Sequence, residues 1–502
     1  MSSIPSNYLV LLSPTSLTGT GLGLFVLWYI LSSVVAWYRL RHIPGPFIAS
    51  FSYLWHMRNI FLGCASPEHI ALKRYGSLVR TGPNYVVTDD PNILRLINGA
   101  RSSWPRDSWY TSSRFDPNYH MLSLLDTAAH DTIKAKLTSG YSGRDVQIEN
   151  GVNTQIEFLV ETIRSRYLST STRHQPTDLA QVIRYFTLDV ITHLSYGTSF
   201  GFLAAEQDLY DYTNSVDRFI RAITLSVDIP LFRWIAYSPL LTGIMPKASD
   251  KSGMGKLIGI GQKIVNERFQ DNEKHTPDML GSFMRHGATR EECVSETMLT
   301  LIAGSDTTAT AIRSTMLYLI STPRVYNRLK AEIQEAASDN RVSSPIGVDE
   351  AKRLPYLQAV ILEGFRMRPP VVYGQYKAAP PGGETINGVF IPGGTAVGQN
   401  AVAMMRSEKA FGAGVDLFRP ERFLECSEEA RREMERTVDL VFGTGRWMCA
   451  GRTVAWVELN KIFFELLRAF DFQPIYPTKP VDEESYALFT HKNMWVAITE
   501  TA

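Results

Sequence analysis

The distribution of hydrophobic and polar positions divides the chain into an apolar N-terminal segment and a long helical body. Residues 1–38 contain no Asp, Glu, Lys, Arg or His, and residues 17–38 are mostly apolar. A helix over residues 17–38 would be about 33 Å long, enough to cross the hydrocarbon core of a bilayer. From about residue 127 to residue 340, apolar positions recur with a helical period. The pattern predicts a transmembrane helix followed by a mainly α body.

Charged residues next to the apolar segment predict its orientation. Arg39, Arg41 and His42 follow it and no cation precedes it, so the positive-inside rule leaves the rest of the chain in the cytosol. A cleaved signal peptide is the alternative, but the basic start and the small-residue cleavage site of such peptides are missing. The next residues, Ile-Pro-Gly-Pro, form a turn through which no helix can continue. We expect four parts: a short lumenal N-terminus (1–16), a transmembrane anchor (17–38), a Pro-Gly-Pro hinge (39–46) and one globular domain (47–502).

Cap and turn signals place the elements of the globular domain. Thr289 begins a capping box and leads a helical pattern that continues to Thr322. Residues 75–97 predict two short strands and then a helix, and residues 371–400 switch to Gly/Pro turns and short extended runs. Residues 450–470 predict a second long helix. The predicted fold class is therefore mainly α with a minor β portion.

The composition narrows the class of protein. The 51 Lys+Arg residues balance 50 Asp+Glu residues, whereas a nucleic-acid-binding domain normally carries a clear basic excess. Hydrophobic residues at 44% and charged residues at 20% are typical of a globular chain with a large core. The four cysteines include no C-x-x-C, which argues against a disulfide scaffold and a cysteine-rich zinc or iron–sulfur site. No H-E-x-x-H is present either, which sets aside a zinc peptidase.

The strongest chemical signal surrounds the last cysteine. Residues 442–451 are Phe-Gly-Thr-Gly-Arg-Trp-Met-Cys-Ala-Gly. Glycines let the backbone form a tight loop whose N–H groups point at one sulfur, and the helix predicted after Cys449 adds its positive end. Both effects favour the thiolate, which is the form that binds a metal. An inert core thiol is the ordinary role of a lone cysteine, and the surrounding glycines argue against it here.

With this loop, the chain resembles the cytochrome P-450 monooxygenases over essentially its whole length. The resemblance implies the cytochrome P-450 fold, a mostly helical prism that holds haem b between the long helix and the cysteine loop. Residues 47–502 would then be the haem-binding catalytic domain, with Cys449 as the axial thiolate ligand that promotes O–O cleavage. The motif implies four further cofactor-binding positions: Phe442, Gly443, Gly445 and Gly451.

A second match lies in the middle of the long helix. Residues 303–308, Ala-Gly-Ser-Asp-Thr-Thr, match the oxygen-activation stretch of the family. Glycine and hydroxyl residues are unfavourable there, and a Thr hydroxyl can bond to a carbonyl one turn earlier and bend the helix. We expect a groove that admits O2, and the resemblance makes Asp306 and Thr307 the catalytic acid–alcohol pair that delivers protons. A polar kink in a buried helix is the alternative for such a stretch alone.

A third match is structural. Glu363 and Arg366 lie three residues apart on one helix face, which by itself is common on helix surfaces. Residues 418–423, Phe-Arg-Pro-Glu-Arg-Phe, follow downstream. The resemblance implies that Glu363, Arg366 and Arg422 form a buried network that secures the cysteine loop, because the planar Arg fork bonds carboxylates and carbonyls together.

The resemblance also implies which side chains contact the haem propionates. His130 and Lys134 occupy positions where the family commonly has Trp and Arg, and Lys377 occupies another usual Arg position. Lys and His keep donors but lose the bidentate geometry of Arg. The Arg that usually lies two residues before the cysteine is replaced by Trp447, so Arg446 is the expected contact there. A plain surface cation is the alternative for Arg446.

Electrons must come from another protein, because the sequence contains neither a dinucleotide fingerprint nor a complete P-loop. The anchor indicates an NADPH-dependent cytochrome P-450 reductase on the same membrane, with cytochrome b5 as a second candidate donor. The expected location is the endoplasmic reticulum, with a single span and a cytosolic catalytic domain. Six cations are expected to form a positive docking face, with a solvated charge run as the alternative: Arg431, Arg432, Arg436, Arg446, Arg452 and Lys461.

The substrate is expected to be hydrophobic, because the segments that the resemblance places around the distal pocket are rich in aromatic residues. These residues are Trp104, Trp109, Tyr110, Phe115, Phe232, Tyr373 and Phe489. The local sequence patterns of the chain are most similar to those of fungal microsomal enzymes of secondary metabolism. The leading hypothesis is a monooxygenase that hydroxylates, epoxidises or oxidatively rearranges a small molecule in a mycotoxin-like pathway. The alternatives are a haem-thiolate isomerase or dehydratase that does not use O2, a degradative (xenobiotic) monooxygenase, and a membrane-tethered haem-binding scaffold.

Overall fold

The computed structural model describes residues 14–64, 66–114, 118–238, 246–271, 275–338 and 342–501. The expected lumenal residues 1–13 and Phe115 lie outside this part of the chain. The α-helices are α1 (Pro14–Leu40), α2 (Leu54–Phe61), α3 (Ser66–Tyr75), α4 (Pro91–Ile97), α5 (Thr127–Tyr141), α6 (Ile148–Thr162), α7 (Leu179–Tyr196), α8 (Phe202–Ala205), α9 (Tyr212–Asp228), α10 (Pro230–Ala236), α11 (Gly253–Gln270), α12 (Met279–Arg285), α13 (Arg290–Ile320), α14 (Pro323–Ser338), α15 (Val348–Ala351), α16 (Pro355–Met367), α17 (Ala401–Met404), α18 (Glu408–Phe411), α19 (Glu428–Val438) and α20 (Arg452–Ala469). The mainly α fold class is confirmed.

Within the described residues, the minor β portion consists of four small sheets. The strands are β1 (Leu78–Arg80), β2 (Tyr85–Thr88), β3 (Thr177–Asp178), β4 (Tyr373–Ala378), β5 (Glu384–Ile386), β6 (Val389–Ile391), β7 (Ala396–Asn400), β8 (Phe470–Pro474), β9 (Asp482–Ser485), β10 (Phe489–Lys492) and β11 (Trp495–Glu500). The largest sheet has the order β1-β2-β7-β4 and pairs β2 with β7 in parallel. A second sheet has the order β3-β11-β8, and β5–β6 and β9–β10 form separate antiparallel pairs.

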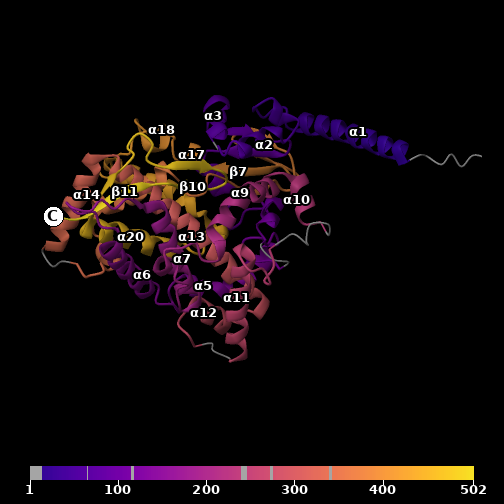
Figure 1. Ribbon diagram of the computed structural model, residues 1–502. Coiled ribbons are helices and arrows are strands. Elements are labelled where there is room, and N and C mark those ends of the chain that lie inside the picture. The colour runs from indigo at the N-terminus through magenta and orange to yellow at the C-terminus, as the bar shows by residue number, and fades with distance from the viewer. Residues whose placement is uncertain are drawn as a thin grey trace, which may run out of the picture.

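Helix α13 runs through the centre of the body (Figure 1) and most of its side chains are buried. Its start is the capping box predicted from the sequence. The Thr289 hydroxyl accepts from the Glu292 N–H at 3.2 Å, and the Glu292 carboxylate accepts from the Thr289 N–H at 2.7 Å. The reciprocal bonds satisfy two N–H groups that a helix start leaves free. Helix α7 packs along α13, and α16 and α20 also contact it.

Helix α1 projects away from the body (Figure 1), and its last turn is fixed by Arg80. The Arg80 side chain is 1% exposed and donates to the carbonyls of Ala36 at 3.0 Å and Ser50 at 2.8 Å. Its backbone N–H donates to the Pro44 carbonyl at 2.8 Å. A Cβ at Gly45 would lie 2.1 Å from the Arg80 carbonyl oxygen, so only glycine permits this approach. These contacts join the end of α1 and the Pro-Gly-Pro segment to the first sheet.

Residues 19–40 of α1 are long and apolar enough to cross a membrane. Only 6% of their most apolar stretch is buried inside the protein. A core helix of a soluble protein would be mostly buried, so the exposure of α1 supports a membrane anchor.

Candidate active site at the cysteine loop

The loop before Cys449 has the tight backbone that its glycines predict. Gly443 and Gly445 have φ angles of 73° and 61°, in the left-handed region that favours glycine. The N–H of Cys449 donates to the Phe442 carbonyl at 2.7 Å and closes the loop. Helix α20 begins three residues later, at Arg452. The loop therefore presents the cysteine just before the positive end of a helix.

The thiol of Cys449 differs from the sequence expectation in one respect. Burial of the sulfur is the largest influence and raises the pKa of Cys449 above its ordinary value, although the residue as a whole is exposed. The backbone N–H groups of Gly451 and Arg452 and the charge of Lys134 lower this pKa, as expected, but by less. These N–H groups act in the direction that the sequence predicts, whereas desolvation, which penalises the charged form, acts against them. A bound metal ion would supply the missing stabilisation.

Helix α5 connects the cysteine loop to the middle of α13. The Lys134 ammonium donates to the carbonyls of Arg446 at 2.6 Å and Met448 at 3.0 Å. Two turns further along α5, the Tyr141 hydroxyl is hydrogen-bonded to the Thr300 hydroxyl of α13. Lys134 thus stabilises the loop backbone directly, which is a use that the sequence did not predict.

Trp447 is the centre of a cluster of cations. The Lys377 ammonium lies 3.7 Å from the centre of its ring, and the Arg106 guanidinium lies 4.3 Å from it. Lys377 is 0% exposed, and within the described residues its Nζ has no hydrogen-bond partner; the same is true of Arg106 Nε. Burial, then the charges of Arg106 and Arg446, lower the pKa of Lys377 to about 6. These two unpaired donor atoms, Lys377 Nζ and Arg106 Nε, fit an anionic group such as a haem propionate, whose negative charge would raise the pKa of Lys377 and keep its ammonium charged.

The other two expected propionate contacts have partners within the protein. The His130 ring lies 4.3 Å from the Trp447 ring, and burial lowers the pKa of His130 to about 4, so the ring is neutral near pH 7. Arg446 forms an ion pair with Asp131 at 3.2 Å. Both side chains border the cluster, but neither is a free cation in this arrangement. Arg106 was missed by the sequence analysis, because only the fold brings residue 106 to residue 447.

Asp306 and Thr307 lie on α13, as predicted, and each has a defined partner. The Thr307 hydroxyl donates to the Ala303 carbonyl at 2.8 Å, which is the expected bond to the previous turn. The Asp306 carboxylate accepts from Arg184 of α7 at 3.0 Å. Arg184 also pairs with Asp217 of α9 at 3.1 Å. An ion-pair chain thus leads from the centre of α13 to α9, and no residue pattern along the chain predicted it.

Gly304 has a different role from the one expected. A Cβ at this position would lie 2.8 Å from two side-chain carbons of Ile191 on α7. The glycine therefore allows α7 to approach α13 closely, and packing explains its presence. The close packing of α7 on α13 is sufficient to explain a glycine at position 304, without the oxygen groove expected from the sequence.

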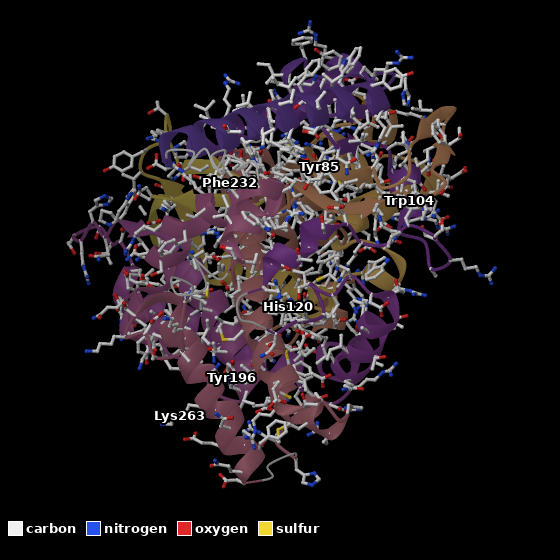
Figure 2. All side chains as sticks on the ribbon, turned by 90° about the vertical axis from the view of Figure 1, so that its right-hand side faces the viewer. Tyr85, Trp104, His120, Tyr196, Phe232 and Lys263 are labelled. Atoms are coloured by element: carbon white, nitrogen blue, oxygen red, sulfur yellow. The ribbon has the colours of Figure 1, made fainter. Side chains whose placement is uncertain are left out.

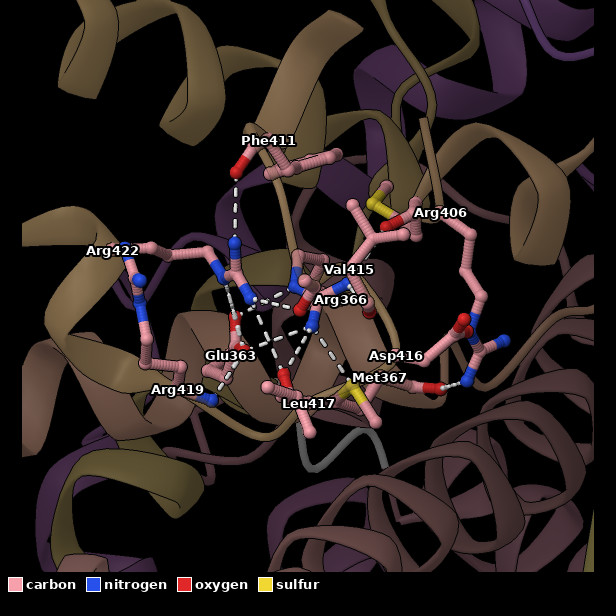
Figure 3. Close-up of polar contacts among 12 residues, drawn as sticks. Glu363, Arg366, Met367, Arg406, Phe411, Val415, Asp416, Leu417, Arg419 and Arg422 are labelled. Carbon is pink, nitrogen blue, oxygen red and sulfur yellow. Dashed lines mark hydrogen bonds and ion pairs between the residues drawn. The ribbon is translucent and has the colours of Figure 1, made fainter. Parts of the chain in front are cut away.

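The predicted Glu–Arg–Arg network is assembled at the C-terminal end of α16 (Figure 3). Glu363 is 0% exposed and its carboxylate accepts from Arg366 at 2.7 Å and Arg422 at 3.0 Å. The two guanidinium groups also donate to backbone carbonyls of a long connecting segment, at Met405, Phe411, Gly414, Val415 and Leu417. The network therefore fixes residues 405–422 directly. It reaches the cysteine loop through α16, whose Phe365 ring packs edge-on against Phe442 at 5.3 Å.

Comparison with known proteins agrees with this site. The family model described as cytochrome P-450 matches residues 73–495. The chain is 46% identical over 469 residues to a protein named cytochrome P-450 monooxygenase aba1 from Botryotinia fuckeliana, covering 92% of each chain. It is 44% identical over 481 residues to cytochrome P-450 monooxygenase ABA1 from Pyricularia oryzae, covering 93% of this chain and 94% of that one. A similar protein from Leptosphaeria maculans, named cytochrome P-450 monooxygenase abl1, is 44% identical over 474 residues, covering 92% of this chain and 83% of its own.

The matched length, the helical fold and the cysteine loop lead to the same assignment. Family members hold haem through a cysteine thiolate and incorporate oxygen from O2. The predicted cofactor and enzyme class are thereby confirmed. The chain belongs to the cytochrome P-450 family and is a haem-thiolate monooxygenase.

Proposed function

We propose that this monooxygenase oxidises a hydrophobic small molecule in a fungal secondary-metabolite pathway, with Asp306 and Thr307 delivering protons. The observation that carries the proposal is the pair itself. It lies on α13 with the Thr307 hydroxyl bonded to Ala303 and the Asp306 carboxylate held by Arg184. A haem-thiolate isomerase or dehydratase does not reduce O2 and so would not need protons delivered to it. The fungal relatives named monooxygenases support the pathway class only by similarity.

Haem bound through Cys449 would supply the O2-activating chemistry at the loop. The chain's own residues would hold it in three ways. Cys449 would ligate the iron, the loop glycines would let the backbone pass closely, and Lys377 and Arg106 would pair with the propionates. His130, Lys134 and Arg446 would shape the rim of the same cluster. Thr307 would hold and pass a proton at its Oγ1, which Asp306 would replenish through water.

Replacing Thr307 with alanine is expected to uncouple NADPH use from oxidation. The variant should keep the haem spectrum, because Thr307 touches no cysteine-loop residue in the described contacts. Product per NADPH should fall by roughly a hundredfold or more, since a positioned proton donor contributes about 10²–10⁴-fold to a rate. Hydrogen peroxide should rise correspondingly. The measurement is the ratio of product to peroxide at equal NADPH consumption.

Thr307→Ser is the matched control, because it keeps the hydroxyl. Its ratio should stay close to that of the parent protein. An unchanged ratio in Thr307→Ala would remove Thr307 from the proton path.

We propose that α1 anchors the protein in the endoplasmic reticulum membrane with the catalytic domain in the cytosol. The body adds exposed apolar side chains on the side from which α1 projects, where Figure 1 places α2 and α10. Large apolar side chains clustered on a surface are typical of contact with a membrane or a protein. They are Phe47, Leu54, Phe61, Leu62, Leu231 and Trp234.

Removing residues 1–30 is expected to release a large part of the protein from membranes without loss of the haem spectrum. The cut leaves Ala36 in place, so its carbonyl still accepts from Arg80. Sedimentation of the membranes measures the release. In sealed microsomes, protease added outside should digest the full-length protein's body, whereas a protected body would show that the orientation is reversed.

An NADPH-dependent reductase is the proposed electron donor. One of the six cations that were expected to form the docking face is not on the surface: Lys461 is 0% exposed and pairs with Glu149. Each of the other five cations lies beside a carboxylate, in the pairs Arg431–Glu435, Arg432–Glu428, Arg436–Glu433, Arg446–Asp131 and Arg452–Asp439. These pairs reduce the positive charge of that surface. The partner proposal therefore rests on the missing nucleotide motif and on the anchor.

A further inference from the structure

Strand β4 and residues 105–110, which lie beside it in the fold, together form a wall. The Ala378 N–H donates to the Pro105 carbonyl at 2.9 Å, and the Asp107 N–H donates to the Tyr376 carbonyl at 3.1 Å. Residues 105–107 thus run beside β4 (Tyr373–Ala378) as an additional strand-like segment, and residues 108–110 begin a 3-10 helix (Ser108–Ser113).

One end of this wall touches the cysteine loop. Arg106 of the first segment pairs with Lys377 of β4, and both side chains lie against the Trp447 ring. Trp447 is two residues before Cys449. The wall therefore begins beside the haem-binding loop.

The other end of the wall is joined to α9 by a buried carboxylate. Asp228, the last residue of α9, is 0% exposed. Its Oδ1 accepts from the Trp109 indole N–H at 2.8 Å, and its Oδ2 accepts from the Tyr373 hydroxyl at 2.7 Å. Trp109 comes from the first segment of the wall and Tyr373 from the second. One side chain thus bonds both segments to the end of α9.

The helix that follows is weakly attached. Helix α10 begins at Pro230, and none of its seven residues, all of which the structure describes, is buried. Arg233 donates to the Tyr85 hydroxyl of β2 at 3.0 Å, to the Ser108 hydroxyl at 2.8 Å and to the Val227 carbonyl of α9. Figure 2 shows Phe232 of α10 close to Tyr85 on the face from which α1 projects. No side chain of α10 is fully buried and only Phe232, Ile235 and Ala236 of its apolar residues are half-buried, so the polar contacts of Arg233 contribute much of what holds α10 in place.

We propose that Asp228 is a positioning residue that latches the α9–α10 junction to this wall and so limits how readily a hydrophobic small molecule reaches the haem. The inference rests on the proposed function, because it concerns the route to the site of oxidation. When the latch breaks, the two hydrogen bonds of Asp228 are replaced by bonds to water. Helix α10 can then move without exposing an apolar core, because none of its residues is fully buried. Movements of this kind admit substrate in many enzymes.

The association rate of phenylimidazole with the iron of the oxidised protein tests the latch. Asp228→Ala removes both bonds and should speed association at least tenfold, which corresponds to about 1.4 kcal/mol; two hydrogen bonds to a charged group contribute more than this. Asp228→Asn should stay within about threefold of the parent, because its amide oxygen still accepts from Trp109 and its NH2 can donate to Tyr373. Tyr373→Phe, which removes one bond, should fall between them. Stopped flow at about pH 8 keeps the carboxylate ionised, since burial raises the pKa of Asp228 to about 6.

Asp189→Ala is the matched control for loss of a buried carboxylate. Asp189 is 1% exposed and accepts from the N–H groups of Gly201, Phe202 and Leu203, away from the wall. The Asp189→Ala variant should have a lower melting temperature than the parent protein but the same association rate for phenylimidazole. Equal rates in Asp228→Ala and the parent, or equal acceleration in Asp189→Ala, would overturn the latch. Each sample is first checked for the carbon-monoxide band of the reduced protein, so that failure of the haem assignment is recognised separately.

Discussion

Replacing Cys449 with alanine is expected to abolish the red-shifted carbon-monoxide band of the reduced protein and all NADPH-dependent oxidation. The closed loop from Phe442 to Cys449 presents one sulfur beside the start of α20. No other cysteine of the chain lies in this loop, so no side chain can replace the thiolate. Because the band depends on thiolate ligation, its loss should be complete, not partial. The measurement is the difference spectrum of reduced protein with and without carbon monoxide.

Cys426→Ala is the control, since Cys426 is a half-buried cysteine of the same part of the chain. It should keep the band at full height. Haem that remains bound to Cys449→Ala should show the spectrum of a different axial ligand. A red-shifted band that survives in this variant would mean that Cys449 is not the ligand.

Replacing Glu363 with alanine is expected to have the largest effect on stability. The substitution leaves Arg366 and Arg422 buried, at 0% and 3% exposure, without their carboxylate. Removing one partner of a buried ion pair costs about 3–5 kcal/mol, which is a large part of the roughly 5–15 kcal/mol that stabilises a native protein. We expect little folded, haem-containing protein at physiological temperature. The measurement is the yield of haem-containing protein and its thermal midpoint.

Glu363→Gln keeps the shape and one acceptor, so it should fold in part and show an intermediate midpoint. Glu157→Ala removes an exposed glutamate and should leave the midpoint unchanged. If Glu363→Ala gave normal yield and midpoint, the network would have no role in holding residues 405–422 or, through α16, the cysteine loop.

Features set by neighbouring residues could be predicted from the sequence. The capping box at Thr289 needs only residues of one helix turn, and it starts α13 as expected. The glycines of the cysteine loop impose their φ angles locally. The bond from Thr307 to Ala303 also lies within one turn. In each case the interacting groups are fixed by their spacing along the chain.

Features that depend on distant segments could not be predicted. Arg106 meets Trp447, and Asp228 meets Trp109 and Tyr373, only because the fold brings these segments together. Lys461 looked like a surface cation, yet it lies in the core beside Glu149. The effect of burial on the pKa of Cys449 could not be predicted for the same reason, since burial depends on the whole fold and not on the loop.

The central claim, that this chain uses O2 to oxidise a small molecule, is tested most directly with isotopically labelled oxygen. Membranes containing the protein and an NADPH-dependent reductase are incubated with a fungal metabolite extract, NADPH and labelled O2, and the products are analysed by mass spectrometry. The account predicts a product that carries one labelled oxygen atom, depends on NADPH and is absent with Cys449→Ala. A product that forms without NADPH and carries no label would contradict it, and would identify the chain as an isomerase or dehydratase.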